Sequence, residues 1–153
     1  MKYNPFFAII IILFMTCSCS KEKINADILI LNGTVYNGID NESTRNAIAI
    51  KDDKIIFVGD PKTVSIVAIK TLDATDLIVS PGFIDPHTHA DRELKDKEVS
   101  HNQPFLFQGI TTVVVGNDGD SFYPTSKYKE LYDAYGIGTN AVLLFGHGTI
   151  REE

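Results

Sequence analysis

Strand-type and helix-type segments alternate in the second half of the chain, and this order restricts the fold more than any other feature. An apolar run ends at His87, and a polar, helix-type stretch follows it. Buried-type strands are expected over 110–115 and 141–145, with a helix over 125–134 between them that Thr125 would cap. Strands that alternate with helices form parallel sheets or barrels. The sequence therefore predicts an α/β fold for residues 81–153.

The preceding part, residues 26–80, consists of short β-type runs broken by turn residues. The Asn-Gly pair at 32–33 is a strong turn signal, and the runs 47–50 and 55–58 flank a polar tip as in a β-hairpin. We therefore expect a small β-rich module over 26–80, preceded by a linker over 19–25.

The first 18 residues are similar to a bacterial lipoprotein signal peptide. Lys2 precedes an apolar run over 5–15, which is too short to cross a bilayer comfortably. Cys19 follows a small serine, as lipid attachment prefers, whereas Cys17 follows a β-branched threonine and is the weaker alternative. We expect an exported protein of the cell envelope, held at the membrane by a lipid on Cys19. Cleavage before Cys19 would leave the folded body without a cysteine.

Charge and composition indicate a globular protein that does not bind nucleic acid. The chain is 44% hydrophobic and 22% charged, which is ordinary for a folded domain. Its net charge is −6, and no basic stripe is present of the kind that a phosphate backbone requires.

Polar residues stand where each expected strand of the second half ends. His87 and His89 are two residues apart, so on an extended backbone both imidazoles would face one ion while Thr88 points away. Asn117-Asp118 and His147 follow the next two strands. Because ligands bind at the carboxyl ends of parallel strands, these side chains form a candidate metal and substrate site.

The segment Pro81-Gly82-Phe83-Ile84-Asp85-Pro86-His87-Thr88-His89 resembles the signature of the amidohydrolase superfamily. That resemblance implies a TIM-type (β/α)₈ barrel beside a small β module, with two histidine metal ligands after the first barrel strand. The segments 108–119 and 146–151 are similar to one branch, the N-acyl-D-amino-acid deacylases. The implied reaction is metal-dependent hydrolysis of an amide bond in a small N-acyl amino acid.

One position departs from this branch, because its members usually carry a cysteine metal ligand where this chain has Asp118. A thiolate favours zinc, whereas a carboxylate binds zinc and also accepts harder ions such as manganese. The resemblance thus implies one or two divalent ions, zinc or manganese, held by His87, His89 and Asp118. The alternative is that Asp118 only forms a turn between Asn117 and Gly119.

Four further residues have open roles. His147 and Arg151 are candidates for substrate binding, the latter through a substrate carboxylate. Asp91 either orients one histidine or caps a helix, and His101 is expected at the surface.

A complete barrel of this type needs roughly 250 residues. We therefore expect this chain to be the N-terminal, inactive part of the enzyme, with the proton shuttle on later strands. The alternatives are a cyclic-amide hydrolase of the hydantoinase or dihydroorotase type, and a non-catalytic surface lipoprotein.

Overall fold

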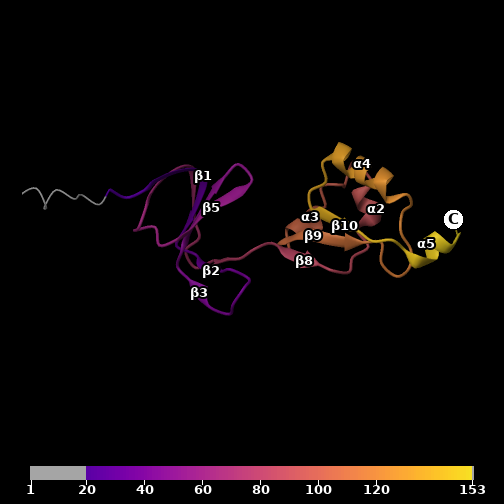
Figure 1. Ribbon diagram of the computed structural model, residues 1–153, viewed down its shortest axis with the longest axis horizontal. Coiled ribbons are helices and arrows are strands. Elements are labelled where there is room, and N and C mark those ends of the chain that lie inside the picture. The colour runs from indigo at the N-terminus through magenta and orange to yellow at the C-terminus, as the bar shows by residue number, and fades with distance from the viewer. Residues whose placement is uncertain (1–19, 153) are drawn as a thin grey trace, which may run out of the picture. The chain divides into compact units, whose positions relative to one another are not determined.

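The computed structural model describes residues 20–152 and divides into two compact units, one ending at Ser80 and the other beginning at Pro81 (Figure 1). The expected signal peptide, Cys17 and Cys19 lie outside the described residues. Within 20–152, no helix combines the length and the apolar character needed to cross a membrane.

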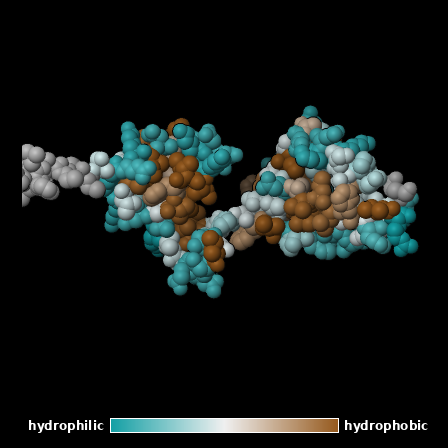
Figure 2. Space-filling view, in the orientation of Figure 1, coloured by the Kyte–Doolittle hydropathy of each residue, from teal (hydrophilic) through white to brown (hydrophobic). Residues whose placement is uncertain are grey.

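The first unit contains two small sheets. Its strands are β1 (Lys23–Leu31), β2 (Thr34–Tyr36), β3 (Ser43–Thr44), β4 (Ala47–Lys51), β5 (Lys54–Gly59), β6 (Ser65–Asp73) and β7 (Ile78–Val79). They pair in the orders β5-β4-β1-β6 and β3-β2-β7. The core of the larger sheet contains Ala26, Leu29, Ala47 and Ala49. The expected β-rich character of this segment is present, and Figure 2 shows a broad apolar area on its visible face.

Two features of the first unit differ from the sequence expectation. Strand β6 was not predicted, although it is as long as β1 and pairs with it in parallel. The same pairing joins Lys23 to Ser65, so β1 begins inside the segment expected as a linker. The linker assignment over 19–25 is therefore wrong from Lys23 onward, because the ladder with β6 orders these residues as strand.

The second unit is a parallel sheet with helices between its strands, as the alternation of segments predicts. Its elements are β8 (Phe83–Asp85), α2 (Asp91–Leu94), α3 (Gln103–Leu106), β9 (Ile110–Val115), α4 (Thr125–Tyr135), β10 (Asn140–Leu143) and α5 (His147–Glu152). The strand order is β10-β9-β8, and both pairings are parallel. The β-rich and mixed units together give an α/β fold.

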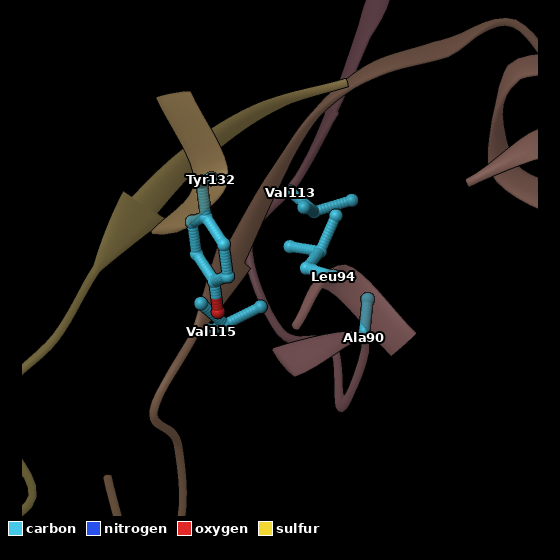
Figure 3. Close-up of a cluster of buried hydrophobic side chains, with 5 residues drawn as sticks. All are labelled: Ala90, Leu94, Val113, Val115 and Tyr132. Carbon is cyan, nitrogen blue, oxygen red and sulfur yellow. The ribbon is translucent and has the colours of Figure 1, made fainter. Parts of the chain in front are cut away.

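One face of this sheet packs against α2 and α4. Val113 and Val115 alternate along β9 and meet Leu94 of α2 and Tyr132 of α4, with Ala90 beside them (Figure 3). Burial raises the pKa of Tyr132 to about 12, with smaller contributions from Asp91 and Tyr128, so its hydroxyl stays neutral. Ala90, the residue after His89, belongs to this cluster, so the chain is packed against the sheet immediately after the histidine pair.

Several element boundaries differ from those expected. The helix-type stretch after His89 forms two single turns, α2 and α3. Immediately before α3, Asn102 adopts a left-handed backbone, and its buried amide donates to Thr139 Oγ1 at 3.0 Å. Helix α4 is present, but Thr125 does not cap it, since the cap position is Pro124. Strand β10 ends at Leu143 rather than at residue 145.

Candidate metal centre

Three of the predicted site residues converge at the ends of β8 and β9. His87 Nε2 lies 3.4 Å from Asp118 Oδ1, and His89 Nε2 lies 3.1 Å from Asp118 Oδ2. One potential ligand atom from each residue lies within 4.8 Å of the others. All three side chains are exposed, by 58%, 68% and 61% respectively, so the cluster is open to an ion and to substrate.

The spacing of these atoms fits a divalent metal. Tetrahedral zinc bonds of about 2.0–2.2 Å place neighbouring ligand atoms about 3.3–3.6 Å apart. The two nitrogen-to-oxygen distances, 3.1 and 3.4 Å, lie close to that range. Two imidazole nitrogens and a carboxylate oxygen form a donor set that zinc accepts and that harder ions also tolerate.

The histidines reach this position by a route that differs from the expected one. Strand β8 ends at Asp85, and His87 lies in a bend. The backbone amide of His87 donates to the Asp85 carboxylate at 3.1 Å. The predicted extended backbone through His89 is therefore wrong. Thr88 does point away from the site, because its hydroxyl donates to the Val114 carbonyl at 2.9 Å and it is only 4% exposed.

Asp118 occupies a turn with a left-handed backbone. Its φ is 61°, between Gly116 at 84° and Gly119 at 90°. Aspartate and asparagine tolerate this conformation better than other residues with a side chain. The turn-forming role and the ligand role are therefore compatible, since the same backbone directs the carboxylate toward both histidines.

The turn around Asp118 packs against the start of α5. The amide of Gly148 donates to Gly119 O at 2.8 Å, and the amide of Gly146 donates to Ser121 Oγ at 2.8 Å. A Cβ atom on Gly146 would lie 2.4 Å from Gly119 O, a separation that requires backbone movement. A glycine at 146 is thus a condition for this packing.

We expect Gly146→Ala to displace the Asp118 turn and to lower metal retention in the folded protein. The overlap is with backbone rather than with a flexible side chain, so relief must come from movement of residues near Gly119. The control is Gly136→Ala, because a Cβ there meets no atom within 4 Å, and the strain that alanine adds at its positive φ of 68° stays at the end of α4. Metal analysis after dialysis should separate the two variants, and equal metal content in both would contradict the expectation.

A cleft of about 660 Å³ opens beside the cluster. Its lining includes His89 and Asp118, together with Asp91, Arg92, Glu93, Asn117, Asp120, Ser121 and Phe122. The lining carries four carboxylates and one guanidinium, so a bound cation would offset much of its negative charge. Arg92 was not identified from the sequence, because its place in the cleft depends on how α2 packs.

The other candidate residues do not belong to the cluster of His87, His89 and Asp118, although Asp91 lines the cleft beside it. His147 and Arg151 are exposed on α5 and do not line this cleft, so their substrate role stays a prediction. Asp91 is the first residue of α2, but Ala90 holds the cap position and no side-chain capping bond forms, so the capping interpretation is wrong. His101 is exposed, as expected.

No family model matches the chain, but curated relatives do. The chain is 31% identical over 148 residues to the D-aminoacylase of Alcaligenes xylosoxydans xylosoxydans, covering 82% of this chain and 30% of that protein. It is 36% identical over 104 residues to the N-acyl-D-aspartate deacylase of the same organism, covering 67% and 20%. The chain thus spans less than a third of the length of these relatives.

Solved structures of the same enzymes have a similar fold. An N-acyl-D-glutamate deacylase from Bordetella bronchiseptica, complexed with zinc and a phosphonate inhibitor, matches with a TM-score of 0.72 and 28% identity over 83% of this chain and 31% of that one. A D-aminoacylase with a binuclear metal centre matches with a TM-score of 0.71 and 30% identity, over 82% and 31%. The chain is therefore a homologue of D-aminoacylase and of the N-acyl-D-aspartate and N-acyl-D-glutamate deacylases, and its structural neighbours have the amidohydrolase fold.

Proposed function

We propose that this chain belongs to a metal-dependent hydrolase that removes the acyl group from N-acyl-D-amino acids. The observation that carries the proposal is the convergence of His87, His89 and Asp118 beside a cleft, in a chain homologous to such deacylases. Three parallel strands with helices on one face are consistent with the start of a TIM-type (β/α)₈ barrel, in which the site would lie at the carboxyl ends of the strands.

His87, His89 and Asp118 would hold the metal, which we propose to be zinc. The two neutral imidazoles contribute no charge, so Asp118 is the ligand that offsets part of the cation's charge. When bound, such an ion polarises the amide carbonyl and lowers the pKa of water. Because Asp118 presents one oxygen to each histidine, its carboxylate would complete the ligand set with both imidazoles. Manganese should bind in the same place, since the carboxylate is a hard ligand.

The cleft would orient the substrate against this site. Arg92 is its one fully cationic side chain and can pair with the carboxylate of an N-acyl amino acid, while Phe122 adds apolar surface. We place the proton shuttle and further metal ligands on later strands of the full-length enzyme.

Turnover of acetylated D-amino acids by the full-length enzyme tests this proposal. We expect hydrolysis of N-acetyl-D-amino acids, little hydrolysis of the L-enantiomers, loss of activity with a chelator and recovery with zinc. The 153-residue chain alone should be inactive, because it spans 30% of the length of the related D-aminoacylase. Hydrolysis of hydantoin or dihydroorotate instead would favour the cyclic-amide alternative, and absence of both metal and turnover would favour a non-catalytic lipoprotein.

A further inference from the structure

The carbonyl of Val114 is shared by three hydrogen-bond donors next to the metal cluster. The amide and the hydroxyl of Thr88 donate to it at 3.0 and 2.9 Å, and Asn117 Nδ2 donates to it at 3.0 Å. The same amide nitrogen of Asn117 also donates to the Thr88 carbonyl at 3.0 Å. We call Thr88, Val114 and Asn117, with these four bonds, the Thr88–Asn117 clamp.

The clamp lies directly beside each of the three candidate ligands along the chain. Thr88 stands between His87 and His89, and Asn117 immediately precedes Asp118. Thr88 is 4% exposed and Asn117 is half-buried, so water competes weakly for these bonds. The three ligand side chains are exposed, whereas the Thr88 side chain is buried between the two segments.

The residue types suit the clamp specifically. A side-chain amide nitrogen carries two hydrogens, which lets Asn117 satisfy two carbonyls at once, whereas an aspartate has no such donor. The threonine hydroxyl supplies a further donor, and a valine of the same shape would not. Neither Thr88 nor Asn117 lies in a strand, and these bonds join the segment of the histidine pair to the end of β9 and to the residue before Asp118.

We propose that Thr88 and Asn117 are positioning residues that set the separation between the histidine pair and Asp118, and with it the affinity and geometry of metal binding. This inference rests on the proposed function, because it presumes that the three residues bind a metal. Loss of such an outer partner typically lowers metal affinity by about 10- to 100-fold.

The test compares four variants of the full-length enzyme after its metal is removed. Asn117→Leu and Thr88→Val remove donors, Thr88→Ser keeps the hydroxyl, and Asn140→Ala is the matched control. Asn140 also donates from a side-chain amide to a carbonyl of β9, that of Thr111 at 3.1 Å, but at the opposite end of the strand. Zinc affinity is measured by competition with a chromophoric chelator, and coordination geometry by the visible spectrum of the cobalt(II)-loaded protein.

We expect Asn117→Leu and Thr88→Val to bind zinc about 10- to 100-fold more weakly and to change the cobalt spectrum. Thr88→Ser and Asn140→Ala should stay close to wild type. If Asn117→Leu does not fold, the comparison of Thr88→Val with Thr88→Ser decides alone. The inference is overturned if the donor-lacking variants keep wild-type affinity and spectrum, or if Thr88→Ser fails as badly as Thr88→Val. A wild-type enzyme that binds no zinc would instead refute the proposed function.

Discussion

In the full-length enzyme, replacing Asp118 with asparagine should remove bound metal and hydrolytic activity together. Asparagine has the same shape and tolerates the left-handed backbone at φ 61°, so the turn should persist. The substitution nevertheless replaces an anionic donor that lies 3.1 Å from His89 Nε2 and 3.4 Å from His87 Nε2. Because losing only an outer partner costs about 10- to 100-fold in affinity, losing this ligand should cost more than about 100-fold. Metal content by mass spectrometry and kcat/KM for an N-acetyl-D-amino acid measure both effects.

Three further variants separate the ligand role from the turn role. Asp118→Ala should also lose metal, although it adds backbone strain, whereas Asp118→Cys should retain zinc and bind manganese less well. Asp52→Asn is the matched control, because Asp52 has a similar left-handed φ of 52° in the turn between β4 and β5. If Asp118→Asn and Asp118→Ala both kept wild-type metal stoichiometry and turnover, Asp118 would be a turn former only.

Truncating Leu94 to alanine should destabilise the protein by about 2–5 kcal/mol. Leu94 is fully buried, and it packs with Val113, Val115 and Tyr132 in the cluster of Figure 3. Its removal leaves a cavity between α2 and the sheet, which the surrounding β9 and α4 can close only in part. Chemical denaturation, followed by circular dichroism, measures the change in the free energy of unfolding.

Phe107 provides the comparison for this prediction. Its side chain is larger than that of Leu94 but 85% exposed, so Phe107→Ala should change the free energy of unfolding by only about 0.5 kcal/mol or less. Equal losses in the two variants would mean that the Leu94 cluster is not the core of this unit.

The strands that the sequence predicted are those with a local signal. The continuous run 110–115 of isoleucine, threonine and valine predicted β9, and the runs of the β4–β5 hairpin flank a polar tip. Strand β6 was not predicted, and its parallel partner β1 is distant in sequence. A local pattern of residues does not specify which distant strand a segment will join, so this pairing could not be predicted.

His87, His89 and Asp118 are neighbours, as the sequence led us to expect, although the backbone path differs; that they bind a metal stays a prediction. Residues that follow adjacent parallel strands meet at one edge of the sheet. His89 follows β8 and Asp118 follows β9, so the two lie close together whether or not the backbone after β8 is extended. The bend at His87 lies instead next to tertiary bonds from the Thr88 hydroxyl to Val114 O and from Asn117 Nδ2 to Thr88 O. Those bonds join separate segments and carry no sequence signature of their own.

The most direct test of metal binding by His87, His89 and Asp118 is a crystal structure of the zinc-loaded full-length enzyme with anomalous data at the zinc edge. The arrangement of these residues predicts an anomalous peak within about 2.0–2.2 Å of an imidazole nitrogen of each histidine and of an Asp118 oxygen. A zinc peak bound only by other residues, or a cluster without any peak in an active enzyme, would contradict it.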